Sequence, residues 1–144
     1  MEIRVEFDNQ ELVRFINGKG PLLFEVSWEN NGTYYPMKHW SDFGNVILGW
    51  WFATTVELLE GADEGKFLFM DGPYSVKAKY NRQTGIVELI PKGRDAVWKM
   101  PIVELLKKLL QAIDKTFEEL SRRGIGEEKQ AALAENSAVL RRYL

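Results

Sequence analysis

The chain has 144 residues, of which 45% are hydrophobic and 28% are charged, so it is long enough for one globular domain with its own core. Its 19 Lys and Arg residues nearly balance its 21 Asp and Glu residues, giving a formal net charge of −2. This balance argues against a general nucleic-acid-binding protein, which needs a dense cationic surface to displace counterions from phosphates.

The chain contains no cysteine and a single histidine, His39. These counts exclude disulfides, thiolate metal sites, cysteine nucleophiles and histidine-rich zinc sites. The N-terminus alternates charged and apolar residues, unlike a signal peptide, and the apolar run at 46–56 is shorter than the roughly 20 residues that span a bilayer. We therefore expect a cytoplasmic protein that has no membrane contact, no metal and no cofactor.

The first third of the chain predicts strands. Residues 2–7 alternate charged and apolar side chains, as a strand with one buried face does, and residues 22–28 alternate in the same way. The segment at 11–16 fits either a strand or one helical turn. Asn and Gly at 30–32 tolerate positive φ, which predicts that residues 33–36 fold back as the second arm of a hairpin.

A helix over about 41–60 follows, and it is the most apolar part of the chain. Ser41 or Asp42 can cap its first turn by accepting a backbone hydrogen bond. The apolar surface is wider than a single stripe, which places this helix at the centre of the fold. Three of the five tryptophans belong to it: Trp40, Trp50 and Trp51. The main apolar stripe is predicted to contain Phe43, Ile47, Trp50, Thr54 and Leu58.

Residues 66–91 predict three antiparallel strands joined by tight turns, and residues 96–100 predict a short edge strand. Pro101 suits the first turn of a long amphipathic helix that ends at Gly124. A weaker, alanine-rich helix is predicted over about 127–143. The expected fold class is therefore α+β: one domain over 1–144, with an antiparallel β-sheet packed against two long α-helices plus a C-terminal helix.

His39 precedes Asp42 by three residues, and a histidine–carboxylate pair is one arrangement for a general base. Catalysis also needs a nucleophile or an oriented substrate, and the sequence identifies neither. A histidine that bonds to backbone at a loop-to-helix junction accounts for the same residues. We therefore predict no catalytic residue.

Several carboxylates could offer oxygen ligands to a hard cation: Asp42, Asp63, Glu64 and Asp71. Calcium-binding loops place such ligands at fixed spacings around a required glycine, and the segment at 60–65 lacks that spacing. Solvated carboxylates in turns are the simpler interpretation.

A second acidic group, which shares two residues with the first, has a stronger claim to function because it gathers at the end of the tryptophan-rich helix. Carboxylates there lie near the negative end of the helix dipole, which slightly destabilises the helix. Proteins can tolerate such a cost when the groups serve binding. The predicted partner-binding residues are Glu57, Glu60, Asp63 and Glu64. The competing interpretation is an ordinary solvated helix end.

The pattern Trp40-x-Asp42-Phe43-x-x-x-Ile47-Leu48-x-Trp50-Trp51, preceded by a strand hairpin and followed by a sheet and a terminal helix, resembles segments of the small immunity proteins of bacterial polymorphic toxin systems. The resemblance implies a non-catalytic protein that binds and neutralises a cognate toxin domain. An acidic surface would speed capture of a basic toxin domain, such as a nuclease.

Two other functions remain open from the residues. The aromatic cluster could line a small-ligand pocket between the sheet and the Trp-rich helix, since ligand pockets are rich in aromatic side chains. An enzyme using His39 with Asp42 is the third hypothesis. The sequence identifies neither the partner nor the oligomeric state.

Overall fold

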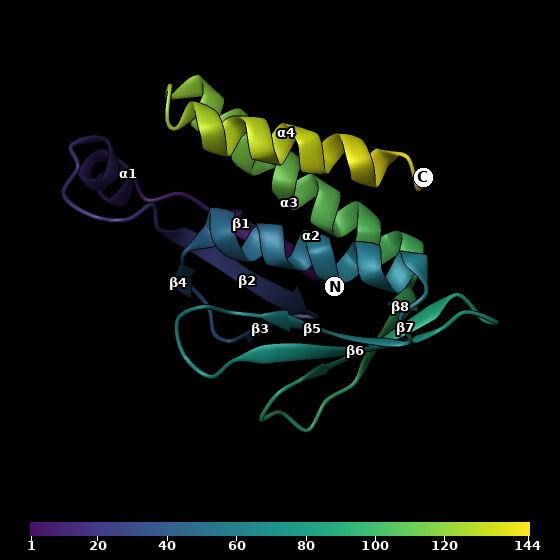
Figure 1. Ribbon diagram of the computed structural model, residues 1–144. Helices are drawn as coiled ribbons and strands as arrows, with labels where there is room; N and C mark the ends of the chain where they lie inside the picture. Colours follow the sequence, from purple (N-terminus) through teal and green to yellow (C-terminus); the bar gives the residue numbers. More distant parts are fainter.

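The computed structural model describes residues 1–144 and has the predicted α+β class, with antiparallel pairing throughout. The strands form two four-stranded sheets rather than the single sheet that we expected (Figure 1). A long helix separates the first four strands from the last four along the chain, and no ladder of hydrogen bonds joins the two groups.

The first sheet is built around its second strand, which pairs with β1 along one edge and with β3 and β4 along the other. This arrangement confirms the strands predicted at 2–7 and 22–28 and the hairpin arm at 33–36. The ambiguous segment at 11–16 belongs to a short helix, α1 (Asn9–Ile16), which Asp8 caps by accepting a 2.8 Å hydrogen bond from the Gln10 N–H. The strands are β1 (Glu2–Glu6), β2 (Phe24–Asn30), β3 (Thr33–Tyr35) and β4 (Ser41–Asp42).

The second sheet is a meander whose strands pair in chain order, which confirms the predicted three-stranded unit and the short edge strand after it. Alternate residues such as Phe67, Val76 and Val87 are buried, while the residues between them face outward, as a sheet with one covered face requires. The strands are β5 (Glu64–Leu68), β6 (Ser75–Asn81), β7 (Ile86–Pro91) and β8 (Trp98–Pro101).

The tryptophan-rich helix, α2 (Gly44–Glu60), begins three residues later than predicted. Ser41 and Asp42 pair with β2 as β4, so neither caps the helix, and Trp40 lies outside it. The Gly44 backbone approaches the ring of Phe24 so closely that an added Cβ would lie 2.1 Å from a ring carbon. Helix and sheet can therefore meet at this position only because the residue has no side chain.

Helix α2 also covers the free edge of the second sheet. Strand β5 pairs only with β6, so alternate backbone groups on its other side lack a partner strand. Trp51 Nε1 donates to the Leu68 carbonyl at 2.7 Å, and Thr54 Oγ1 donates to the Lys66 carbonyl at 3.0 Å. The helix thereby satisfies groups that an exposed edge would offer to another chain.

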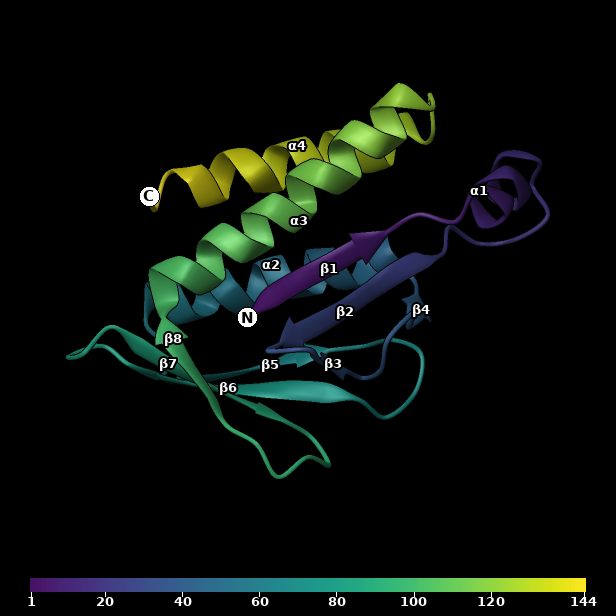
Figure 2. The ribbon, with the colours of Figure 1, turned by 180° about the vertical axis from the view of Figure 1, so that it is seen from behind.

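Two helices complete the fold and lie side by side above α2 in both ribbon views (Figures 1 and 2). They are α3 (Ile102–Arg122) and α4 (Glu127–Arg141), as predicted apart from their last residues. The Ser137 hydroxyl bonds to Asp114 at 2.7 Å, and Leu133 and Leu140 are buried. None of the four helices combines the length and hydropathy needed to cross a bilayer.

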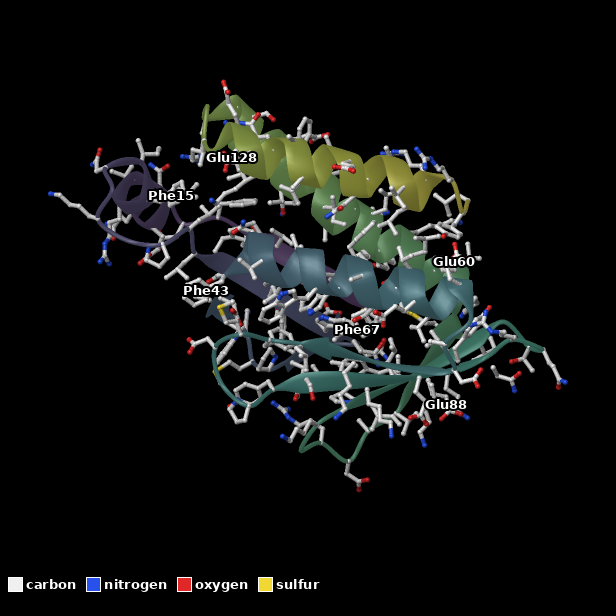
Figure 3. All side chains as sticks on the ribbon, viewed as in Figure 1. Phe15, Phe43, Glu60, Phe67, Glu88 and Glu128 are labelled. Carbon is white, nitrogen blue, oxygen red and sulfur yellow. The ribbon has the colours of Figure 1, made fainter.

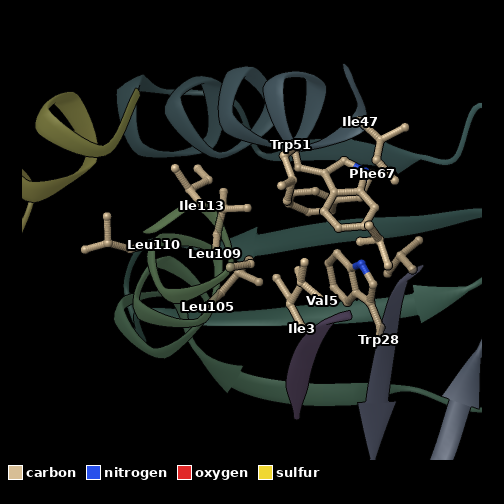
Figure 4. Packing of buried hydrophobic residues seen from close by; sticks show 14 of the residues in the cluster. Ile3, Val5, Trp28, Ile47, Trp51, Phe67, Leu105, Leu109, Leu110 and Ile113 are labelled. Atoms are coloured by element: carbon tan, nitrogen blue, oxygen red, sulfur yellow. The ribbon is translucent and has the colours of Figure 1, made fainter. Parts of the chain in front are cut away.

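The core lies where the inner faces of the two sheets meet α2 and α3 (Figure 4). The rings of Trp28 and Trp51 meet edge to face with centroids 5.4 Å apart, and Phe67 lies 5.1 Å from Trp28. All three side chains are almost fully buried. Trp28 Nε1 is buried without a hydrogen-bond partner, whereas Trp51 Nε1 has one.

Candidate functional site

The outward face of α2 carries the most distinctive exposed surface of the molecule. Only four residues of this helix are exposed, and they recur every three or four positions, which places them in one line along the helix. We call this line the exposed stripe of α2, and it consists of Trp50, Ala53, Glu57 and Glu60.

The position of Trp50 corrects the sequence analysis, which placed this residue in the buried stripe. Trp50 is 40% exposed, whereas its neighbour Trp51 is fully buried. Successive helical residues differ by about 100° in direction, and Trp51 shares its side of the helix with the other buried residues, so Trp50 is turned toward the surface. The buried stripe consists of Gly44, Ile47, Leu48, Trp51, Thr55 and Leu58.

The four predicted partner-binding carboxylates gather at one end of this stripe. Glu57 and Glu60 belong to it, Asp63 lies in the turn that follows α2, and Glu64 is the first residue of β5. All four are exposed, and Figure 3 shows Glu60 at the C-terminal end of α2.

Two basic side chains and the phenol of Tyr143 also reach this helix end, so its net charge is less negative than the sequence implies. Arg82 donates to the carbonyls of Leu58 and Ala62, the latter at 2.9 Å, and its positive charge offsets the negative end of the helix dipole. Glu64 pairs with Lys77 at 3.5 Å. The four carboxylates therefore sit at a helix end that the protein itself stabilises.

Among these carboxylates, Glu57 and Asp63 form no side-chain ion pair or hydrogen bond within the chain. Glu60 differs because it accepts a hydrogen bond from the hydroxyl of Tyr143, which raises the pKa of Tyr143 above its ordinary value. Glu57 and Asp63 are thus the two predicted residues that are free to meet another molecule without breaking a contact.

The structure does not bring His39 and Asp42 together as the third hypothesis required. Asp42 is fully buried and accepts hydrogen bonds from Trp40 Nε1 at 3.0 Å and from the N–H groups of Phe43 and Asp71. His39 instead lies 3.1 Å from a carboxylate oxygen of Glu25. Asp42 therefore has a structural role, because its side-chain hydrogen bonds connect β4 to the turn after β5.

The candidate cation ligands are also dispersed. The carboxylate of Asp42 bonds to the backbone N–H of Asp71 and not to its side chain, while Asp63 and Glu64 lie at the other end of α2. No group of three or more acidic or histidine side chains has the arrangement of a metal site.

The space between the Trp-rich helix and the sheets is filled by Trp28, Trp51 and Phe67, which leaves little room for the pocket of the second hypothesis. Two surface hollows occur elsewhere, on the outward faces of the two sheets. Sequence reasoning did not find them because they depend on how neighbouring strands and a loop come together.

Comparison with known proteins adds no further constraint on the site. No family model matches the chain, and neither a curated protein nor a solved structure matches it.

Proposed function

We propose that this protein is a non-catalytic immunity protein that binds a cognate bacterial toxin domain in the cytoplasm and neutralises it. The observation that carries the proposal is the exposed stripe of α2, in which a 40% exposed tryptophan shares one helix face with the unpaired carboxylate of Glu57. The resemblance of the segment at 40–51 to immunity proteins supports the same conclusion.

Trp50 is suited to be the anchor of such an interface. Tryptophan is enriched among the few residues that dominate binding energy at protein interfaces, and such residues lie near the centre of the contact. Trp50 stands on a helix whose opposite face is fixed in the core by Trp51, so its backbone is held in place before binding. Little ordering entropy is then lost when a partner covers the ring.

The carboxylates would act at the rim of the same contact. Glu57 follows Trp50 by two helical turns, which is about 10 Å along the axis, and Asp63 lies beyond it. Rim charges chiefly set association rate and partner choice, so these groups favour a toxin domain with a basic surface. Neutralisation follows when the bound protein covers the surface that the toxin uses on its target.

The test is calorimetric titration of the protein with the product of the adjacent gene, which the proposal expects to contain the toxin domain. Replacing Trp50 by Ala should weaken the affinity by about 30-fold or more, which corresponds to about 2 kcal/mol. The matched control is Val103→Ala, because Val103 is 44% exposed but lies on α3. Equal affinity of the Trp50→Ala variant and the wild-type protein would exclude this surface, provided that both have the same denaturation midpoint.

Charge reversal tests the acidic rim separately. Glu57→Lys combined with Asp63→Lys should slow association by about tenfold at low salt and much less at high salt, because screening shortens the reach of surface charges. Glu118→Lys, an exposed position on α3, is the control. Association rates that do not depend on these charges would remove the basic partner from the proposal.

A further inference from the structure

A polar hollow on the outward face of the first sheet has the features of a small-ligand site. It encloses about 530 Å³, within the range of small-molecule sites, and it is formed by β1, β2, β3 and the loop at 36–40. Strands β1 and β2 stand in front of α2 in Figure 2, so this face points away from the exposed stripe of α2.

The floor of the hollow is Ser27, a short side chain among long ones. Ser27 is only 5% exposed, and its hydroxyl makes no hydrogen bond within the protein. Its cross-strand partner is Arg4, and the next outward residue of β2 on one side is Glu25. Trp28 Nε1 is the only fully buried side-chain polar atom that lacks a partner, so the Ser27 oxygen is open to solvent in the hollow, where its hydroxyl can donate and accept hydrogen bonds.

One wall of the hollow is held in an unusual backbone conformation. His39 has φ of 62°, in the left-handed region that costs free energy for residues other than glycine, and its imidazole lies 3.1 Å from Glu25. Such strain persists where surrounding contacts impose it, and it gathers at binding sites. Beside it, the Lys38 ammonium lies 5.7 Å from the centre of the Tyr34 ring and has no carboxylate partner.

The charges of the hollow belong to two neighbouring cross-strand pairs of β1 and β2. Glu6 and Glu25 form an acidic pair, and Arg4 and Ser27 form the next pair whose side chains point outward, two residues farther along the strands. Lys38 adds a second cation to the lining. Arg4 also pairs with Glu29 at 3.3 Å and Glu6 pairs with Lys115 at 3.5 Å, but these ion pairs are solvent-exposed and therefore weak, so a ligand can compete for both groups. A purely anionic ligand would meet the two carboxylates, and a purely cationic ligand would meet Arg4 and Lys38, so each would suffer like-charge repulsion.

We propose that this hollow binds a small zwitterion of amino-acid size. Its ammonium group would lie against Glu6 and Glu25, and its carboxylate would accept hydrogen bonds from Arg4, Lys38 and the Ser27 hydroxyl. This site is independent of the proposed toxin-binding surface and lies on another face of the molecule.

The test uses the full chain labelled with ¹⁵N and the twenty protein L-amino acids, each titrated separately while the amide signals of Ser27 and His39 are followed. At least one amino acid should produce saturable shifts at both residues. Its N-acetyl derivative lacks the ammonium group and its amide lacks the carboxylate, so each should bind about tenfold more weakly or worse.

Lys38→Ala and Ser27→Ala should both weaken binding, while Lys107→Ala, which removes an exposed lysine on α3, should leave it unchanged. Lys38 is a surface residue, so its variant tests the site even if Ser27→Ala does not fold. Three results would overturn the proposal: no saturable shift with any amino acid, equal binding of the blocked derivatives, or equal binding of D-glucose, which would indicate a neutral polar site.

Discussion

The two faces of α2 present the same amino acid in opposite environments. Trp51 is fully buried, packs against Trp28 and donates its indole hydrogen to the Leu68 carbonyl. Trp50, one residue earlier, is 40% exposed and has no hydrogen bond. Trp51 therefore stabilises the fold, whereas Trp50 is available for binding. The direction in which each side chain leaves the helix, rather than the residue type, decides this difference.

The largest expected effect is a difference in the free energy of unfolding between alanine variants of these two tryptophans. Trp51→Ala should lower the free energy of unfolding by about 3–5 kcal/mol, because it leaves a large cavity and an unpaired carbonyl. Trp50→Ala should lower it by about 1 kcal/mol or less, since surface substitutions usually cost little. Denaturant titration of both variants measures the difference, and equal losses would mean that the two rings are buried alike.

Two glycines of α2 sharpen the same comparison without changing a large side chain. Gly44→Ala should destabilise the protein by about 1–3 kcal/mol or more, because the new Cβ meets the Phe24 ring. Gly49→Ala should instead stabilise it by up to about 1 kcal/mol, because a Cβ there meets nothing within 4 Å and alanine favours the helix. Thermal midpoints that move in the same direction would contradict this assignment of faces.

A third pair isolates the hydrogen bond that Trp51 makes to the edge of β5. Replacing either Trp51 or Trp28 by Phe removes an indole N–H group, and the two substitutions remove the same side-chain volume. Only the N–H of Trp51 has a hydrogen-bond partner. Trp51→Phe should therefore cost about 1–2 kcal/mol more than Trp28→Phe, since it leaves the Leu68 carbonyl unsatisfied. Unfolding free energies that agree within error would show that this bond adds nothing.

The smallest effect concerns the acidic end of α2. Arg82→Met keeps most of the side-chain length but removes the guanidinium that binds the last carbonyls of the helix, and it should cost about 0.5–1 kcal/mol. Lys79→Met on β6, the strand just before Arg82, is the control, because Lys79 forms no ion pair. A loss no larger than that of the control would mean that the helix end does not depend on this charge.

Much of the fold follows from local patterns in the sequence. The strands at 2–7, 22–28 and 74–80 were predictable because one face of each is buried, which leaves a period of two in the residues. The α1 segment stayed ambiguous because eight residues contain too few turns to show a helical period. The division into two sheets depends on long-range pairing that no local pattern records.

The candidate sites were harder to predict for two physical reasons. Helix α2 is apolar on most sides, so hydrophobicity alone could not separate Trp50 from Trp51. The four carboxylates were found because they are close in the sequence, whereas Arg82, whose charge offsets the negative end of the helix dipole there, comes from the distant turn between β6 and β7. The hollow over Ser27 likewise requires three strands and a loop to come together.

The most direct test of the central claim is ¹⁹F NMR of the protein carrying 5-fluorotryptophan, recorded in H₂O and D₂O with and without the proposed toxin partner. Among the five tryptophan signals, that of Trp50 should show the largest solvent isotope shift in the free protein and lose it in the complex, while those of Trp28 and Trp51 show none in either state. A complex in which the Trp50 signal keeps its full isotope shift would contradict the account, because the outward face of α2 would then remain in water.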